Sequence, residues 1–223
     1  MSNYIFITGT NADVGKTYFG VSLIKYINYS TTCLAFKPIE TGCKQTRKNL
    51  MPSDSSKYYK VVKDSINLEQ INPYRFLDPV SPNLAIKKAK RRIYLNNYKK
   101  KLNEISKNKY PILIEGAGGA FSPIALDGLN IDFMKLIKSK NIMIVKDELG
   151  CIGSTLSHYH SFKKYKVPLD FIILNTHKKN KMDNFNEIKK YVDVPLYSFG
   201  KSSHDNIKCL KVIKNSLLKI QKS

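Results

Sequence analysis

The residues with the clearest chemical signature lie near the start of the chain, in the segment TGTNADVGKT at residues 8–17. A short apolar run precedes this segment and an amphipathic pattern follows it, which is the strand-loop-helix setting of a phosphate-binding loop (P-loop). In such a loop Gly15 allows close approach to the backbone, Lys16 reaches the β- and γ-phosphates of a nucleotide, and the Thr17 hydroxyl can bind Mg²⁺. The spacing departs from the usual pattern, because Thr10 stands where the first glycine is expected. The segment still predicts a nucleotide site.

Two carboxylates, Glu115 and Asp54, are candidates for holding the magnesium ion of such a site. Glu115 ends the apolar run ILI, and the stretch GAGG after it leaves room for a ligand beside the backbone. The alternative for Glu115 is a structural role as a cap of the turn that follows the strand. Asp54 lies in the segment PSDSS before a helical pattern, so it is either a helix N-cap or a metal ligand. Its spacing alone leaves both open.

The elements that must position these residues follow from the apolar pattern. Short runs rich in Ile, Val or Phe predict strands at residues 4–8, 33–37, 111–115, 142–146 and 169–175. Between them lie helical patterns, such as the i, i+4 spacing of Phe19, Leu23 and Ile27. An amphipathic stripe near the end of the chain consists of Ile207, Leu210, Ile213 and Leu217.

Continuous apolar strands separated by helices predict an α/β fold. We expect three layers, with a doubly wound, mostly parallel sheet of the P-loop NTPase type and ligands at the carboxyl ends of its strands. No internal repeat or linker-like segment interrupts the 223 residues, so we expect residues 1–223 to form a single domain.

The net charge of +21 suggests a polyanion partner, but the composition favours another interpretation. The 38 basic residues include only four arginines, Arg47, Arg75, Arg91 and Arg92, and arginine is the preferred bidentate reader of phosphate and guanine. The densest basic stretch, residues 87–101, is expected to be a polar helix with a solvated face, and a polyanion contact is the alternative. We therefore expect no nucleic acid partner.

Cysteine usage and hydropathy exclude further classes. The four cysteines contain no C-x-x-C pair, which excludes a disulfide scaffold and disfavours a zinc ribbon. The first residues, MSNYIF, lead directly into a strand-like run without a basic segment or cleavage site, and no apolar run is long enough to cross a bilayer. We expect a cytoplasmic protein without membrane contact.

These motifs together resemble dethiobiotin synthetases from end to end of the chain. The matching segments are GTNADVGKT (residues 9–17), FKPIETG (36–42), Asp54 in its SD context, NPYRFLDPVSP (72–82), EGAGGAFSPI (115–124) and LGCIG (149–153). A P-loop alone is generic, whereas the proline-rich segment and the GAGG loop in this order and spacing are much more specific.

The resemblance implies an ATP-dependent ligase of biotin biosynthesis. Its substrates are 7,8-diaminopelargonate and CO₂, and its products are dethiobiotin, ADP and phosphate. A carbamate formed from one amine and CO₂ is phosphorylated to a carbamic-phosphoric anhydride, which the neighbouring amine attacks. The resemblance also implies a homodimer, with the substrate site at the subunit interface.

The resemblance assigns roles residue by residue. Lys16 and Lys37 are the catalytic lysines, serving the phosphates and the carbamate, and we expect them on adjacent strand ends. Mg²⁺ is held by Thr17, Asp54 and Glu115. The nucleotide is bound by Asp13, Val14, Gly15, Lys16, Thr17, Tyr18, Asp54, Glu115, Gly116, Ala117, Gly118, Asn175 and Thr176. The diamine is bound by Thr41 and Gly118, and its carboxylate tail by Gly150, Cys151, Ile152 and Gly153 of the partner subunit, with Cys151 a packing residue rather than a nucleophile.

Two departures from the family pattern concern the ligands. Ala12 and Asp13 stand where family members often carry Thr and Glu, which removes a hydroxyl and shortens a carboxylate. The segment YSFG at residues 197–200 replaces the usual G-x-I-P segment near the base, so nucleotide selectivity is open.

Three rival functions share parts of this pattern. A partition-type ATPase that binds DNA has the same fold, but its signature lysine falls at position 11, which is Asn11. A cobyrinate-type amidotransferase needs a further glutaminase domain, which we do not expect here. A nucleotide kinase needs arginines in its lid, and arginine is scarce.

Overall fold

The computed structural model describes residues 3–47, 49–107, 109–176, 182–200 and 202–217. Within these residues the main sheet has six parallel strands, in the order β10-β9-β8-β1-β7-β2. Their bounds are β1 (Tyr4–Gly9), β2 (Leu34–Phe36), β7 (Ile112–Gly119), β8 (Lys140–Lys146), β9 (Phe171–Thr176) and β10 (Leu196–Gly200). Strands buried on both faces explain the continuous apolar runs of the sequence.

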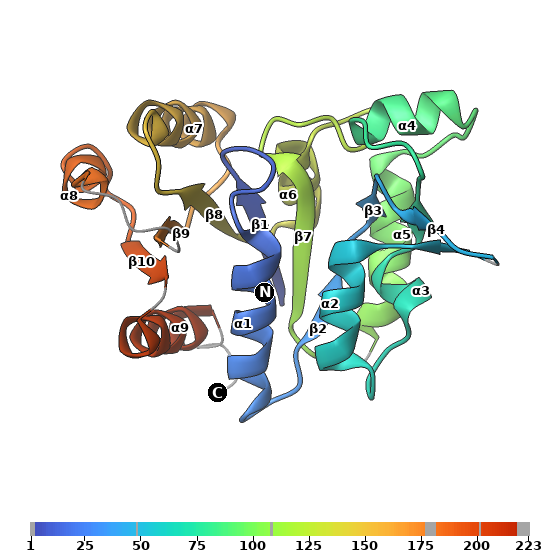
Figure 1. The fold of residues 1–223 in the computed structure, drawn as a ribbon, viewed down its shortest axis with the longest axis horizontal. Helices are drawn as coiled ribbons and strands as arrows, with labels where there is room; N and C mark the ends of the chain where they lie inside the picture. Colours follow the sequence, from blue (N-terminus) through green and yellow to red (C-terminus); the bar gives the residue numbers. More distant parts are fainter. Residues whose placement is uncertain (1–2, 48, 108, 177–181, 201, 218–223) are drawn as a thin grey trace.

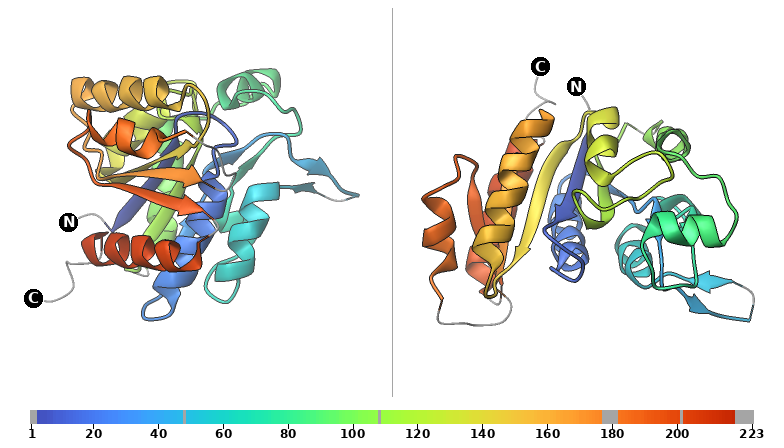
Figure 2. Two further views of the ribbon diagram at one scale, coloured as in Figure 1. Left: turned by 60° about the vertical axis from the view of Figure 1, so that its left-hand side comes forward. Right: turned by 90° about the horizontal axis from the view of Figure 1, so that it is seen from above.

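Helices cover both faces of the sheet (Figures 1 and 2). On one face α1 (Lys16–Asn28) packs against α2 (Ser53–Val62) and α9 (Ser203–Leu217). On the other face α6 (Asn130–Ile137) contacts β1 and β7, and α7 (Cys151–Tyr165) contacts β8 and α8 (Asn184–Lys189). This is the predicted three-layer, doubly wound arrangement.

The connection between β2 and β7 forms a small layer of its own beside the sheet (Figure 1). It contains α3 (Leu68–Ile71), α4 (Pro82–Lys88), α5 (Leu95–Ser106) and four short strands. Strand β3 (Ile39–Glu40) pairs in parallel with β6 (Tyr74–Arg75), and β4 (Lys44–Gln45) pairs antiparallel with β5 (Leu50–Met51). The same connection also contains α2, and it places α2 and the residues around Glu40 beside the P-loop.

The five predicted strands are confirmed, and the main sheet contains one further strand that the sequence did not reveal. The added strand is β10, where Leu196, Tyr197 and Ser198 are only half-buried because it lies at the edge of the sheet. Half-burial removes the continuous apolar run that marks the other strands. Strand β7 also continues beyond Glu115 to Gly119, so Glu115 lies inside a strand rather than at its end.

Two helix predictions are wrong in detail. Residues 87–101 do not form one helix, because α4 ends at Lys88 and α5 begins only at Leu95, with Lys90 in a left-handed conformation at φ 52° between them. In α9 the stripe is buried at Leu210, Ile213 and Leu217, but Ile207, near the start of the helix, is 54% exposed.

Candidate active site

The P-loop joins β1 to α1 at the carboxyl edge of the sheet. Asp13 and Gly15 have positive φ values of 54° and 97°, which turn the chain tightly into the first residue of α1, Lys16. A side chain at Gly15 would also collide with Asn175, whose Nδ2 lies 2.2 Å from the position of the missing Cβ. Glycine is therefore required here for conformation and for space. The N-terminus of α1 contains no acidic residue in its first turn, which suits an anionic ligand.

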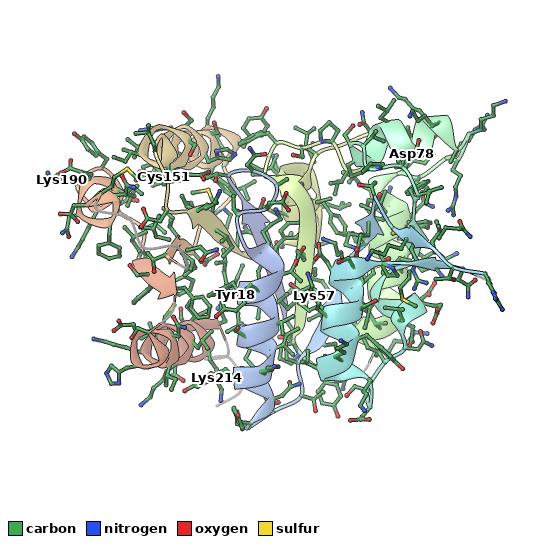
Figure 3. All side chains as sticks on the ribbon, viewed as in Figure 1. Tyr18, Lys57, Asp78, Cys151, Lys190 and Lys214 are labelled. Carbon is green, nitrogen blue, oxygen red and sulfur yellow. The ribbon has the colours of Figure 1, made fainter. Side chains whose placement is uncertain are left out.

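A cavity of about 410 Å³ opens beside this loop. It is large enough for a small ligand. Most of the predicted site residues line it, namely Asp13, Gly15, Lys16, Thr17, Tyr18, Lys37, Thr41, Asp54, Glu115, Gly116, Ala117 and Gly118. Ala12, Ile39, Glu40 and Lys57 complete the lining. Figure 3 shows Tyr18 on α1 and Lys57 on α2, the two helices that flank the cavity.

A buried ion pair crosses the floor of the cavity between Lys37 and Glu115. The Lys37 Nζ atom lies 2.5 Å from Oε1 of Glu115 and 3.8 Å from Oδ2 of Asp54. Burial by itself lowers the pKa of Lys37, but the carboxylates of Glu115, Asp54 and Glu40 outweigh it and the pKa is raised. Lys37 is therefore a fixed positive charge at neutral pH. Asn72 holds its backbone, donating to the Lys37 carbonyl at 2.7 Å.

The sequence led us to expect Lys16 and Lys37 on adjacent strand ends, and this prediction is wrong. Strand β7 lies between β1 and β2 and brings Glu115 between the two lysines. The Lys16 Nζ atom donates to the Asn11 carbonyl at 2.8 Å, which folds the side chain over its own loop. Burial is the main cause that lowers the pKa of Lys16 to about 8, and nearby Lys37 adds to it. An anionic phosphate is the natural partner for such a group.

Asp54 does not cap a helix. Helix α2 begins at Ser53 with Pro52 as its N-cap residue, and the Asp54 side chain faces Lys37 and Lys57 instead. The backbone N–H of Asp54 donates to Glu40, at 2.8 Å from Oε1. Burial alone would raise the pKa of Asp54, but Lys37 and Lys57 outweigh it and the pKa is lowered. The carboxylate is therefore ionised and directed toward the cavity.

The donor set of the cavity fits Mg²⁺. The Thr17 hydroxyl donates to Oε1 of Glu115 at 3.1 Å, and the same hydroxyl is one of the groups that lower the pKa of Asp54. Among the described residues no three His, Cys, Asp or Glu side chains gather into a closed metal cluster. Two carboxylates and a hydroxyl form an open set of hard oxygen ligands, and Mg²⁺ typically completes such a set with phosphate oxygens and water.

On the side expected for the base, the residues contact the loop rather than the cavity. The Asn175 amide donates to the Val14 carbonyl at 2.9 Å, and the Val14 side chain is buried in the core. Thr176 ends β9 opposite Gly200, the last residue of β10. The Tyr18 ring packs on Phe199 with centroids 5.6 Å apart. The YSFG segment thus forms an aromatic strand edge beside the P-loop.

The segment from Gly150 to Gly153 lies away from the cavity of its own chain. It opens α7, with Gly150 as the N-cap residue at φ 87°. Cys151 is buried among core side chains, and burial raises the pKa of its thiol, which agrees with a packing role. In the part of the chain that the structure describes, none of these residues lines the P-loop cavity.

The sequence comparisons identify the family. A family model described as an AAA domain matches residues 3–198. An ATP-dependent dethiobiotin synthetase from Clostridium botulinum is 30% identical over 212 residues, covering 92% of this chain and 93% of that protein. The chain belongs to the dethiobiotin synthetase family. A dethiobiotin synthetase from Legionella pneumophila (strain Paris) is 32% identical, covering 86% of this chain and 90% of its own length.

Solved structures share the fold of this dethiobiotin synthetase family member at low sequence identity. A ParA family ATPase from Chlorobium tepidum has a TM-score of 0.56 at 14% identity, covering all of this chain and 95% of its own. A MinD cell division protein from Aquifex aeolicus has a TM-score of 0.56 at 12% identity, covering 96% and 90%. These likenesses show the P-loop NTPase fold alone, and the sequence relatives favour the synthetase over the partition-type alternative. Among the described residues, no helix has the length and apolar character to span a membrane.

The structure of this family member reveals two residues that the sequence analysis did not single out. Glu40 is a buried carboxylate that accepts hydrogen bonds from the Asp54 and Ser55 backbones and from the Ser55 hydroxyl, at 2.8, 3.0 and 2.6 Å. Tyr58 donates to Oε2 of Glu115 at 2.6 Å. The only sequence signal for Glu40 is a charge inside the segment KPIETG, and Tyr58 lies in a helix with no motif.

Proposed function

We propose that this chain uses ATP to close the ureido ring of dethiobiotin from 7,8-diaminopelargonate and CO₂, releasing ADP and phosphate. The observation that carries the proposal is the meeting of Lys16, Lys37 and Glu115 in one cavity at the N-terminus of α1. The reaction is inferred from family membership. The cavity contains groups suited to the phosphates, the carbamate and the Mg²⁺ ion of that reaction.

The reaction proceeds in three bond-forming steps. One substrate amine attacks CO₂ and loses a proton, which gives a carbamate. A carbamate oxygen then attacks the γ-phosphorus of ATP, and the bond to the ADP oxygen breaks. The second amine attacks the carbonyl carbon of the resulting anhydride, forms the second C–N bond, loses a proton and expels phosphate. The carbamate and the transferring phosphoryl group are both anionic, so the protein must align them and neutralise charge.

The two buried lysines suit these tasks. Lys16 follows the P-loop directly and binds the β- and γ-phosphates, exchanging its contact with the Asn11 carbonyl for phosphate oxygens. Lys37 is held rigidly by Glu115 and by the backbone contact from Asn72, so its ammonium is preorganised for the carbamate oxygen. Thr41, in the same cavity lining, hydrogen-bonds the diamine.

The nucleotide lies along the P-loop, from Asp13 to Tyr18, and Gly116, Ala117 and Gly118 also line its cavity. Asn175 and Thr176 face the base at the end of β9, where Asn175 also holds the loop through Val14. Thr17, Asp54 and Glu115 would hold Mg²⁺, which when bound neutralises charge on the β- and γ-phosphates.

The substrate's carboxylate tail binds the start of α7 in a second subunit. This part of the proposal rests on the family resemblance and on the position of Gly150 to Gly153 outside the cavity of their own chain. Backbone N–H groups at a helix N-terminus favour an anion. The working unit is then a homodimer.

A coupled assay for ADP release tests the proposal, with diaminopelargonate and bicarbonate omitted in turn. We expect ADP release only when both are present, because the carbamate is the phosphoryl acceptor and water is a poor substitute for it. Mass spectrometry of the product should give dethiobiotin. ATP hydrolysis that DNA stimulates and the diamine leaves unchanged would instead support a partition-type ATPase.

A further inference from the structure

Tyr58 is a buried polar residue that the proposed mechanism does not use. It lies in α2, is 1% exposed, and does not line the P-loop cavity. Its hydroxyl donates to Oε2 of Glu115 at 2.6 Å. Burying a phenol hydroxyl is costly unless it finds a hydrogen-bond partner, and a bond to an ionised carboxylate is among the stronger ones. The contact is therefore a defined link between α2 and β7.

The space for this contact comes from Gly20 in α1. A Cβ atom at Gly20 would lie 2.1 Å from the Tyr58 hydroxyl oxygen and 3.0 Å from Cζ of the same ring. Any larger side chain at position 20 would push the phenol off Glu115. Glycine is a poorer helix former than alanine, so local propensity alone does not favour it at this position.

The two carboxylate oxygens of Glu115 have different hydrogen-bond partners. Oε1 contacts Thr17 at 3.1 Å and Lys37 at 2.5 Å, both of them residues of the cavity. Oε2 is bound by the Tyr58 hydroxyl. A carboxylate held at one oxygen cannot rotate freely, so the phenol fixes which oxygen of Glu115 faces the P-loop.

We propose that Tyr58 is a positioning residue that orients Glu115 for the magnesium-nucleotide, and that Gly20 is the small residue that permits it. This inference rests on the proposed function, because Glu115 is a magnesium ligand only there. Partners that orient metal ligands typically change metal affinity by about 10- to 100-fold when removed. Tyr58 acts through Glu115 and makes no contact with the substrate cavity.

The experiment is a fluorescence titration of Tyr58→Phe with mant-ADP at several Mg²⁺ concentrations. Tyr58→Phe keeps the ring and removes only the hydroxyl. We expect mant-ADP affinity without Mg²⁺ to stay within about 2-fold of the parent, and the Mg²⁺ concentration for half-maximal enhancement to rise about 10-fold. Tyr59→Phe is the matched control, since Tyr59 lies next on α2, is half-buried, and forms no hydrogen bond to Glu115 in the described structure.

A second variant separates positioning from packing. Gly20→Ala leaves Tyr58 intact but displaces its hydroxyl, so it should raise the Mg²⁺ requirement much as Tyr58→Phe does. In the Tyr58→Phe background Gly20→Ala should add little, because the contact is already lost. Thermal unfolding of each variant confirms that it is folded.

Three results would overturn the inference. The first is an unchanged Mg²⁺ requirement in folded Tyr58→Phe. The second is a loss of mant-ADP affinity in Tyr58→Phe that is as large without Mg²⁺ as with it. The third is that the effects of Tyr58→Phe and Gly20→Ala on the Mg²⁺ requirement add fully in the double variant. Failure of the proposed function is a separate result, because it would show in the parent protein as ADP release that does not require diaminopelargonate and bicarbonate.

Discussion

Lys37 directly follows β2 and Glu115 lies inside the neighbouring parallel strand β7, each one residue beyond the Phe36–Ile114 pair of the register. Their side chains meet at 2.5 Å, and both residues are almost fully buried. A buried ion pair of this kind adds little net stability, but breaking it leaves an uncompensated charge in the interior. The pair therefore links the proposed carbamate lysine to the proposed magnesium ligand.

The first prediction concerns Lys37. Lys37→Ala removes the preorganised charge, so the rate of dethiobiotin formation should fall by about 10²- to 10³-fold. It also leaves Glu115 unpaired and should cost about 3–5 kcal/mol of unfolding free energy. Steady-state kinetics and urea denaturation measure the two effects. Lys44→Ala, on the exposed strand β4, is the control and should match the parent in both. Parent-like turnover by Lys37→Ala would contradict the assignment.

The second prediction concerns Lys16, whose pKa burial lowers to about 8. A lysine whose pKa is lower in the folded than in the unfolded chain destabilises the fold while it is protonated. For Lys16 the destabilisation is complete below about pH 8, the folded pKa, and fades as the pH rises to 10.5, the ordinary lysine pKa. Lys16→Met should therefore raise the unfolding free energy of the nucleotide-free protein at pH 7 by about 1–3 kcal/mol. The same variant should lose ATP binding. Urea denaturation and mant-ADP titration check both, and a less stable Lys16→Met would contradict the prediction.

The third prediction concerns Glu40, which caps the start of α2 through Asp54 and Ser55. Glu40→Gln replaces one acceptor oxygen by an N–H₂ group that faces the donors of α2. We expect a loss of about 1–3 kcal/mol in unfolding free energy. The start of α2 should also loosen, which hydrogen exchange of the Asp54 and Ser55 amides would reveal. Glu69→Gln, whose side chain on α3 is exposed, is the control. Unchanged protection of those two amides would show that the cap is dispensable.

The fourth prediction concerns the proposed subunit interface at Gly153. A Cβ at Gly153 meets no atom within 4 Å, so Gly153→Arg should fold normally. The large side chain should nevertheless block the carboxylate tail in the neighbouring subunit's site and abolish activity. Mixing it with Lys37→Ala should restore activity, up to about half of a normal dimer per heterodimer, since one site in each heterodimer carries neither defect.

The control for this mixing experiment is native mass measurement of the heterodimer, which proves subunit exchange. Exchange without any recovery of activity would show that the carboxylate site lies within one chain or elsewhere. Full activity of Gly153→Arg alone would exclude Gly153 from the substrate site.

The fifth prediction concerns the cysteines, all four of which are free and buried. Burial raises the thiol pKa of Cys33 and of Cys209 to about 12, from an ordinary value of 9.0. The thiolate fraction of each is then on the order of 10³-fold below that of an exposed thiol at pH 8. We expect the native protein to react with Ellman's reagent at least about 100-fold more slowly than the unfolded chain. Rapid labelling of any cysteine in the native state would contradict this.

The strands and the P-loop could be predicted because their signals are local. The apolar runs reflect burial on both faces of a parallel sheet, and the segment at residues 8–17 contains its loop, glycine and phosphate-binding groups in one stretch. Lys16 and Thr17 are placed by the chain itself, because they begin the helix that follows the loop. For the same reason β10 was missed, since an edge strand is only half-buried and lacks the continuous apolar run.

What the tertiary structure decided was which of these elements are neighbours. Strand order placed β7 between β1 and β2, so Glu115 separates two lysines that the sequence suggested were adjacent. Asp54 changed from a possible cap to a cavity residue because Glu40, on β3, binds the start of α2 in its place. The contact of Tyr58 with Glu115 joins residues 57 positions apart and depends on a glycine in a third element. Such contacts follow from the packing of whole layers, and no periodicity within a single segment encodes them.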